Sequence, residues 1–294
     1  MKWGILGTSF ISGVMADAIK GDAQSELYAV AGRTEKTLNE FAAQYQPTLT
    51  FNSYEALIED ESVDIIYIAL PNHVHHEYVI KAAQKGKAIL CEKSLSVDME
   101  KTEQALQAVK ASGVFFAEGL MYLNHPLIAK LHQELATGEI GDVRSIQGSY
   151  VAAIDQFVNP ASKGALYNLG CYPMSLIHSV AKHQFGESVF DDVQISAIGR
   201  RGQDGNICES SAMMRFNDRF TSQIHTAEDH GLKHGFTILG SKGCITLDTN
   251  PWLPTEENSF TVERGDTQLA APMATHQDSR VIMKLLTDWE QAAS

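Results

Sequence analysis

The chain has 294 residues, of which 44% are hydrophobic and 20% are charged, and its formal net charge is -13. This composition is that of a globular protein and excludes a disordered or collagen-like chain. The excess of acidic residues repels polyphosphate, so we expect no nucleic-acid partner. The length favours two domains, with one large domain as the alternative, and a chain of this size can bury a core that needs no disulfide or metal to hold it.

The four cysteines lie far apart in the sequence, and no two of them form a C-x-x-C pair. This spacing predicts reduced, mostly buried thiols in a cytoplasmic protein, and it gives no support to a zinc or thioredoxin-type site. The apolar run at the N-terminus is too short for a signal peptide, and no apolar stretch approaches the roughly 18 residues of a membrane span. We therefore expect neither a leader peptide nor a membrane partner.

Apolar runs of strand length alternate with amphipathic helical patterns as far as about residue 120. Strands are predicted over residues 2–6, 26–31, a short stretch at 51, 63–70, 88–92 and 114–117. Helices are predicted over residues 9–20, 34–45, from 53 to at least 58, 74–85 and 97–112. This alternation predicts parallel strands joined by helical crossovers, with both faces of the sheet covered.

The pattern changes beyond residue 120, where runs with strand character follow one another. Strands are predicted over residues 143–150, 193–198, 212–216, 220–226, 236–239 and 244–247, with hairpin turns at 217–218 and 240–243. Helices are predicted over residues 126–137, 173–183 and about 278–293. We therefore divide the chain into residues 1–120 and an α+β domain over 121–294 with a mostly antiparallel open sheet, whose last helix could pack back on the first domain.

A glycine turn follows the first predicted strand, in the run G-T-S-F-I-S that begins at Gly7. The Rossmann fingerprint G-x-G-x-x-G uses its glycines for the turn and for the close approach of a pyrophosphate to the next helix N-terminus. Serine replaces two of the three glycines but is small enough to keep that approach open. The turn alone fits a ligand-free connection equally well, but its place in a β/α run favours dinucleotide binding by Gly7, Thr8, Ser9, Phe10 and Ile11.

The second predicted strand ends at Arg33, with no acidic residue before Glu35. NAD sites usually place Asp or Glu here on the ribose 2′-hydroxyl, whereas NADP sites place an arginine near the 2′-phosphate. Because arginine makes charge-assisted hydrogen bonds with phosphate, Arg33 predicts that NADP(H) is favoured over NAD(H). The alternative is an arginine in a solvated loop.

Two charged residues, Glu92 and Lys93, close the fifth predicted strand. In open α/β sheets the carboxyl ends of the strands form the ligand edge. A lysine there can bind a substrate oxygen or lower the pKa of a neighbour, and the alternative is a solvated strand end.

Short motifs recur in a specific order along nearly the whole chain. They cover residues 3–9, 70–75, 91–94, 118–122, 125–126, 138–141, 168–173 and 240–243. With them the chain resembles the Gfo/Idh/MocA family, and within it the dihydrodiol dehydrogenase-like branch. The resemblance implies a Rossmann domain followed by a domain whose open sheet often forms the dimer face, so we expect a homodimer or higher homo-oligomer.

The resemblance also implies an NAD(P)-dependent oxidoreductase that transfers hydride between nicotinamide and a hydroxyl or carbonyl carbon of a sugar, polyol or dihydrodiol-like substrate. The family's E-K-P motif falls on Glu92, Lys93 and Ser94, and its second catalytic position falls on Tyr172. Lys93 and Tyr172 are thus the catalytic candidates. Tyr172 would exchange the proton, with a pKa lowered by the Lys93 ammonium, and the alternative is a half-buried core tyrosine.

The resemblance assigns the remaining site residues. Tyr122 and Asn168 are expected to contact substrate. The cofactor pocket is expected to include Leu70, Pro71, Asn72, His75, Glu92 and Lys93. The histidines near residue 75 do not predict a metal site, because side chains at a helix start diverge and no cysteine or acid completes the set.

A competing hypothesis is a catalytically inactive nucleotide-binding regulator or partner protein. The altered glycine turn, Ser94 in place of proline and Asn168 in place of an acid favour it. Retention of both Lys93 and Tyr172 favours the enzyme.

Overall fold

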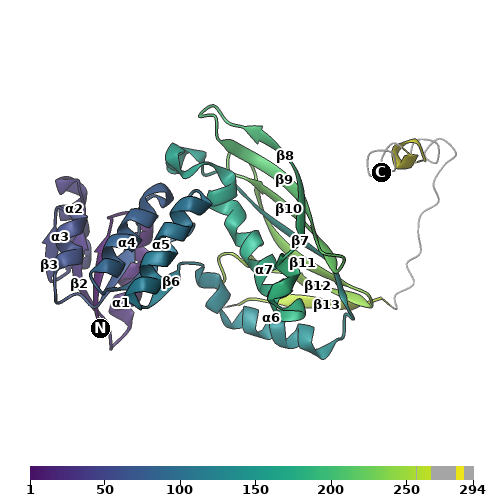
Figure 1. The fold of residues 1–294 in the computed structure, drawn as a ribbon, viewed down its shortest axis with the longest axis horizontal. Helices are drawn as coiled ribbons and strands as arrows, with labels where there is room; N and C mark the ends of the chain where they lie inside the picture. The colour runs from purple at the N-terminus through teal and green to yellow at the C-terminus, as the bar shows by residue number, and fades with distance from the viewer. Residues whose placement is uncertain (256, 266–282, 288–294) are drawn as a thin grey trace. The chain divides into compact units, whose positions relative to one another are not determined.

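The computed structural model describes residues 1–255, 257–265 and 283–287 (Figure 1). Its first sheet is parallel, with the strand order β3-β2-β1-β4-β5-β6. The strands are β1 (Lys2–Leu6), β2 (Glu26–Ala31), β3 (Leu49–Phe51), β4 (Ile65–Ile68), β5 (Ala88–Cys91) and β6 (Phe116–Glu118). The helices between them are α1 (Phe10–Gly21), α2 (Glu35–Tyr45), α3 (Tyr54–Glu59), η1 (Asn72–Val74), α4 (His75–Gln84) and α5 (Met99–Ser112).

Helices cover both faces of this sheet, which is why its strands are nearly continuous apolar runs. Ile5 belongs to one apolar cluster and Leu6 to another, and both side chains are fully buried. The register aligns Leu6 with Ala31 and with Ile68, and Ile68 with Cys91. The residues that follow these four strands therefore share one edge of the sheet.

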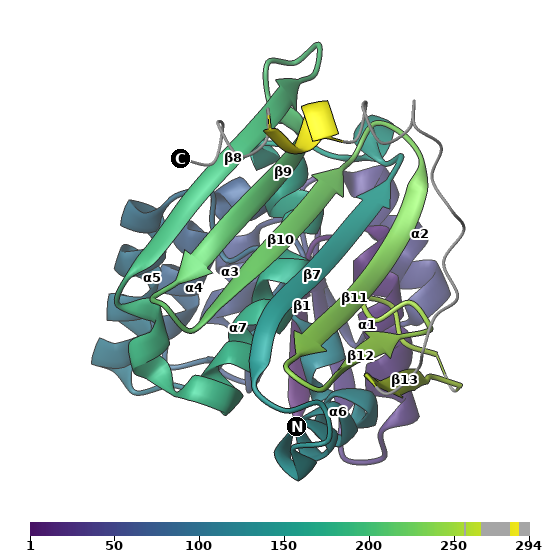
Figure 2. The same cartoon turned by 90° about the vertical axis from the view of Figure 1, so that its right-hand side faces the viewer.

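The second sheet has the order β13-β12-β11-β7-β10-β9-β8, and Figure 2 shows it face on, with α7 behind it. Strand β10 pairs with β7 in parallel, whereas the pairs β10–β9, β9–β8, β7–β11 and β11–β12 are antiparallel. Its strands are β7 (Val143–Ala152), β8 (Val193–Arg201), β9 (Ile207–Phe216), β10 (Phe220–Ala227), β11 (Leu232–Gly240), β12 (Gly243–Leu247) and β13 (Phe260–Arg264). The α-helices are α6 (Pro126–Thr137) and α7 (Cys171–Phe185), the π-helix η5 (Leu166–Gly170) precedes α7, and short 3-10 helices are η2 (Met121–Asn124), η3 (Asp155–Phe157), η4 (Pro160–Ser162) and η6 (Glu187–Phe190).

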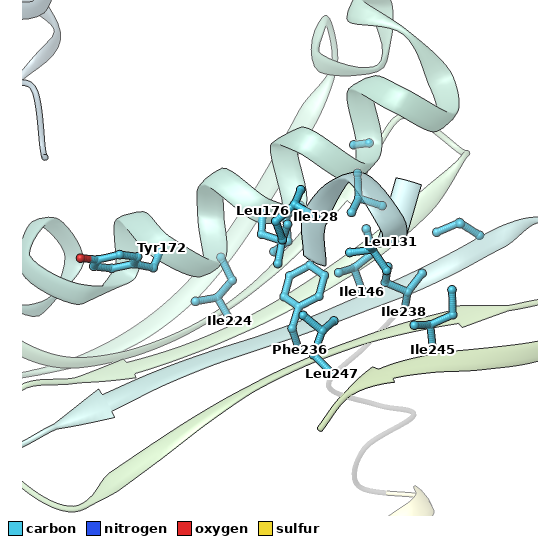
Figure 3. Packing of buried hydrophobic residues seen from close by; sticks show 14 of the residues in the cluster. Ile128, Leu131, Ile146, Tyr172, Leu176, Ile224, Phe236, Ile238, Ile245 and Leu247 are labelled. Carbon is cyan, nitrogen blue, oxygen red and sulfur yellow. The ribbon is translucent and has the colours of Figure 1, made fainter. Parts of the chain in front are cut away.

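The core of the second domain lies between these helices and one face of the sheet. Leu131 of α6 and Leu176 of α7 are fully buried against strand residues such as Ile146 and Phe236 (Figure 3). Tyr172 belongs to the same cluster, at its end (Figure 3). The fold thus anchors the ring of Tyr172 in the core.

The predicted fold class, a Rossmann domain followed by an α+β domain with a mostly antiparallel sheet, is confirmed. Strands β9 and β11 are longer than predicted, and β13 and the π-helix η5 were not predicted. The predicted helix over 278–293, with any packing on the first domain, falls mostly outside the described residues, of which 283–287 are helical. All four cysteines are free, and no helix among the described residues has the length and apolar character to cross a membrane.

Candidate active site

The turn after β1 requires glycine at position 7. Gly7 has a φ of 106°, and a Cβ added there would lie 2.7 Å from the carbonyl oxygen of Ala69. Helix α1 begins three residues later and has no acidic residue in its first turn. Its first N–H groups have no partner within the helix, so this end of α1 suits an anion such as a pyrophosphate.

The serines that replace fingerprint glycines bond to each other. The Ser9 amide donates to Ser12 Oγ at 3.2 Å, and the two hydroxyls lie 3.1 Å apart. Ser12 is fully buried, whereas Ser9 and Phe10 are exposed and Ile11 and Thr8 are half-buried. Ser12 therefore completes the turn itself, while the earlier residues of the run remain accessible.

Arg33 lies two residues beyond the end of β2, on the same edge as the glycine turn. Its guanidinium carbon lies 5.6 Å from the centroid of the Tyr54 ring, and the side chain is exposed. Arg33 forms no ion pair with any residue that the structure describes. The edge therefore carries a cation that is available to a phosphate.

The segment after β4 contributes Leu70, Pro71 and Asn72 to this edge. Asn72 is only 6% exposed, and its Nδ2 lies 3.4 Å from the Ser162 carbonyl. Its Oδ1 is buried and has no hydrogen-bond partner in the described part of the chain. An unpaired buried acceptor is costly, and a ligand that donates a hydrogen bond would remove that cost.

His75 lies behind this edge. Its ring is fully buried, with Nε2 2.6 Å from the Leu70 carbonyl and Nδ1 2.9 Å from the Ser94 carbonyl. The two carbonyls favour a charged ring, but burial outweighs them and lowers the pKa of His75 to about 4. The ring thus ties the segment after β4 to the segment after β5. Both of its nitrogens face protein carbonyls, and the predicted cofactor contact of His75 stays a prediction.

This burial predicts how one residue contributes to the pH dependence of stability. The folded pKa of His75 lies below the ordinary 6.5, so the unfolded chain takes up a proton that the native state excludes as the pH falls. From His75 alone we expect the free energy of unfolding to fall by roughly 2 kcal/mol between pH 7.5 and pH 5. Urea unfolding gives the free energy of unfolding at both pH values. Its difference between pH 7.5 and pH 5 should be smaller in His75→Asn than in the parent by that amount.

The exposed His234 of β11 supplies the control for that measurement. His234→Asn should keep the parental difference between the two pH values. If His75→Asn also keeps the full parental difference, then the ring does not exclude the proton in the folded protein.

The neighbouring histidines form no metal cluster in the described residues. The group with suitable spacing there is Glu209, His225 and His230, on the second sheet and the loop after β10. Arg200 already bonds to this group, because its Nε donates to Glu209 Oε2 at 3.0 Å. A guanidinium on that carboxylate disfavours a second cation there.

Glu92 directly follows β5, at the same edge of the sheet. The Tyr67 hydroxyl donates to Glu92 Oε1 at 2.5 Å, and the Lys93 amide donates to Glu92 Oε2 at 3.3 Å. Burial raises the pKa of Glu92, although these bonds and the Lys93 charge act in the opposite direction. The carboxylate is therefore oriented before any ligand arrives.

Lys93 reaches from the first domain to the second. Its Nζ donates to the Asn168 carbonyl at 2.8 Å and lies 5.0 Å from the centroid of the Tyr172 ring. Ser94, which follows Lys93 through a cis peptide bond, donates from Oγ to the Tyr167 carbonyl at 2.8 Å. The end of β5 is thus docked on η5, and it brings the lysine against the face of the tyrosine.

Tyr172 lies in the first turn of α7 and is 7% exposed. Rings of Tyr150 and Trp252 pack around it, with centroids 5.3 Å and 6.3 Å away. Its hydroxyl points away from the labelled aliphatic residues in Figure 3, and it has no hydrogen-bond partner among the described residues. The structure therefore offers a phenol that is free to bond to a ligand.

The predicted lowering of the Tyr172 pKa is wrong for this structure. Burial raises the pKa of Tyr172, and the nearby Cys171, Tyr150 and Glu92 add to the rise. Desolvation dominates because the ring is enclosed by aromatic side chains. The resting form is therefore the neutral phenol, which can donate a proton.

Tyr122 and Asn168, the predicted substrate contacts, both make protein contacts in this structure. Tyr122 is 1% exposed, and its hydroxyl bonds to the Tyr172 carbonyl at 2.9 Å and to Ser175 Oγ at 2.6 Å. Asn168 Nδ2 donates to Glu228 Oε2 at 2.7 Å. The polar groups of both side chains are thus hydrogen-bonded within the protein, and direct contact with a substrate stays a prediction.

Sequence reasoning missed Glu228, Tyr150 and Trp252. Tyr150 lies near the end of β7, and Glu228 directly follows β10. The sequence signal that could have found Tyr150 and Glu228 was their position at the ends of predicted strands. What brings them together is the parallel pairing of β7 with β10, which aligns Tyr150 with Thr226. Trp252 lies in a loop, where no periodicity marks it.

Two family models match the sequence. The model described as an oxidoreductase family with an NAD-binding Rossmann fold matches residues 1–120, and the model described as the GFO/IDH/MocA C-terminal domain matches residues 128–246. The chain belongs to the Gfo/Idh/MocA oxidoreductase family. The resemblance inferred from the motifs is confirmed, and with it the prediction of an NAD(P)-dependent oxidoreductase.

Known members of the Gfo/Idh/MocA family resemble the chain over most of its length. The trans-1,2-dihydrobenzene-1,2-diol dehydrogenase of Sus scrofa is 27% identical, over 87% of this chain and 76% of that protein. The D-xylose 1-dehydrogenase (NADP(+)) 2 of Haloferax volcanii is 33% identical, over 60% of this chain and 55% of that protein.

A solved structure supports the same architecture. KijD10, a 3-ketoreductase from Actinomadura kijaniata in complex with NADP and TDP-benzene, matches with a TM-score of 0.80 at 24% identity. The match covers 91% of this chain and 82% of that chain. At this identity the likeness shows the fold, in which a Rossmann domain precedes a second, mixed sheet.

Proposed function

We propose that this Gfo/Idh/MocA enzyme interconverts a hydroxyl and a carbonyl group on a small sugar, polyol or dihydrodiol-like molecule, with NADP(H) favoured over NAD(H). The observation that carries the proposal is the Tyr172 hydroxyl, which is free of partners among the described residues and lies beside Lys93. The names of the similar proteins, a dihydrodiol dehydrogenase, a xylose dehydrogenase and a 3-ketoreductase, support this substrate class.

The residues at the nucleotide edge fit a dinucleotide. The α1 N-terminus suits the pyrophosphate, the unpaired acceptor of Asn72 suits a ligand donor, and Arg33 suits a 2′-phosphate. When bound, the nicotinamide would supply or accept the hydride. The residues proposed to hold the cofactor are Gly7, Thr8, Ser9, Phe10, Ile11, Arg33, Leu70, Pro71, Asn72, His75, Glu92 and Lys93.

The catalytic residues proposed are Lys93 and Tyr172. In the reductive direction the neutral phenol of Tyr172 donates its proton to the carbonyl oxygen of the substrate. Lys93 donates one of its three ammonium N–H groups to the Asn168 carbonyl, which leaves two for the substrate oxygen. In the oxidative direction the Tyr172 phenolate takes the proton from the hydroxyl group, and the Lys93 ammonium, 5.0 Å from the ring centroid, offsets part of the cost that burial adds to forming this phenolate.

We propose a boundary near residue 120 between a Rossmann domain (1–120) and a substrate and dimerisation domain (121–294). The end of the parallel sheet at β6 and the ranges of the two family models support it. We also propose a homodimer or higher homo-oligomer through the open face of the second sheet, seen in Figure 2, to whose exposed residues Ile198 and Met213 belong. Four free cysteines support a cytoplasmic location.

Titration of the purified protein with NADPH and NADH, followed by nicotinamide fluorescence, tests the cofactor assignment. We expect the parent to bind NADPH more tightly, and Arg33→Ala to weaken NADPH binding by about 10- to 100-fold, since a hydrogen bond to a charged group contributes about 1.5–3 kcal/mol. NADH binding should change little. Lys36→Ala, which removes an exposed cation from α2, is the matched control and should leave both affinities unchanged.

Two outcomes would contradict these assignments. Equal NADPH affinity in Arg33→Ala and the parent overturns the role of Arg33. If the folded parent binds neither nucleotide, the proposed function fails and the inactive regulator becomes the better hypothesis. Binding followed by turnover in a screen of diols, sugars and their keto forms supports the enzyme.

A further inference from the structure

Glu228 is a buried acid that the mechanism above does not use. It follows β10 directly, and the residue is 4% exposed. Its backbone is held firmly, because its carbonyl accepts from the Ile154 and Asp155 amides at 2.7 Å and 3.0 Å, and its amide donates to Cys208. These backbone hydrogen bonds therefore fix the position from which the Glu228 side chain extends.

The Glu228 carboxylate has an unusual environment. No lysine or arginine of the described residues forms an ion pair with it. The neighbouring Asp155, Asp204 and Asp229 act with burial to raise the pKa of Glu228, whereas the Asn168 amide lowers it. A buried acid without a counter-ion is costly to the fold, so the contact with Asn168 is the interaction that offsets this cost.

Asn168 connects this acid to the catalytic lysine. Its side-chain Nδ2 donates to Glu228 Oε2 at 2.7 Å, and its backbone carbonyl accepts from Lys93 Nζ at 2.8 Å. The residue belongs to η5, a π-helix that leads directly into the turn holding Tyr172. Glu228 thus binds the side chain of Asn168, and the backbone carbonyl of Asn168 binds Lys93.

We infer that Glu228 is a positioning residue, which through Asn168 holds the carbonyl that orients the Lys93 ammonium beside Tyr172. The inference rests on the proposed function for its consequence in catalysis. A shift of the Asn168 carbonyl moves the ammonium, and misplacement by about 1 Å can cost roughly 100-fold in rate. Glu228 touches neither the substrate nor the cofactor in this scheme.

A double-mutant cycle tests the coupling. We expect Glu228→Ala to lower kcat by about 10- to 100-fold with KM nearly unchanged. Asn168→Ala should cost a similar factor, and the double variant should cost no more than the worse single variant, because both act through one contact. Glu228→Gln keeps an acceptor of the same size and should retain kcat within about 3-fold of the parent. Asp155→Asn, at an exposed acid beside Glu228, is the control and should match the parent.

A second measurement does not depend on turnover. Trinitrobenzenesulfonate labels free amines, and peptide mass spectrometry locates the label. We expect Lys93 to be labelled at least about 3-fold faster in Glu228→Ala than in the parent, because the ammonium loses its fixed carbonyl, while labelling of the other lysines stays the same. Melting temperatures of all variants confirm that each is folded at the assay temperature.

The outcomes separate the two claims. The positioning role is overturned, even when the parent is active, if the loss of kcat in the double variant equals the product of the two single losses. Unchanged labelling of Lys93 in Glu228→Ala overturns it as well. Faster Lys93 labelling in a protein that turns over no substrate supports the positioning role and overturns the proposed function. A lower melting temperature in Glu228→Ala with parental kcat and labelling assigns Glu228 to stability alone and overturns the inference.

Discussion

Replacing Tyr172 with phenylalanine is expected to lower kcat by about 10²- to 10⁴-fold, the range for loss of a positioned general acid. The melting temperature should stay close to that of the parent, because the hydroxyl bonds to no other described residue and its removal breaks no contact of the fold. Nucleotide binding should also be unchanged. Steady-state kinetics on the best substrate of the screen, with a thermal melt of each variant, is the measurement.

Tyr28→Phe is the matched control for this experiment. Tyr28 lies on β2, where its ring contacts the Lys2 ammonium at 4.5 Å from the centroid, away from Lys93 and Tyr172. The same change of phenol to phenyl there should leave kcat unaltered. Retention of most of the activity by Tyr172→Phe would remove Tyr172 from the mechanism and leave it as a core tyrosine.

Lys93→Met should lower kcat/KM by about 10²- to 10³-fold, the usual cost of removing one donor that stabilises a reacting oxygen. Methionine keeps much of the aliphatic stem, while the charge and its contact with the Tyr172 ring are lost. We expect the loss to appear mainly in kcat. Lys93→Arg should recover only part of the activity, because the planar guanidinium cannot occupy the place of the compact ammonium.

Lys163→Met supplies the control for the lysine. Like Lys93, Lys163 donates from Nζ to a backbone carbonyl of the other domain, in this case that of Val97 in the first domain at 3.0 Å. It thus resembles Lys93 in its contact but does not face Tyr172. Equal losses in the two variants would show that the loss of a contact between the domains, and not the chemistry of Lys93, explains the effect.

The first domain could be predicted closely from its sequence. Its inner strands β1, β2, β4 and β5 are largely buried, so each is a short apolar run that alternates with an amphipathic helix. Strands β1 and β2 and the end of α5 match the predicted bounds. The shared edge of Arg33 and Lys93 follows from the same pattern, because the carboxyl ends of parallel strands meet there.

The second domain was harder to predict because one face of its sheet is open. The first residues of β11 are exposed and mixed in polarity, so its predicted bounds began at Phe236 and not at Leu232. The π-helix η5 has no periodicity that distinguishes it from a loop. Helix α7 begins before Pro173, since proline is tolerated in a first turn.

By itself, the sequence of this protein determined the residue types and their order along the chain. These predict a Rossmann domain, Arg33 as a candidate for nucleotide binding at the edge of its sheet, and Lys93 and Tyr172 as the catalytic candidates. The tertiary structure alone decided the environment of those groups: the burial that keeps Tyr172 protonated, the diversion of the Tyr122 hydroxyl to Ser175, and the contact of Asn168 with Glu228. The reason is that desolvation and hydrogen bonding depend on side chains that β10, η5 and the loop after β12 bring together from distant parts of the chain.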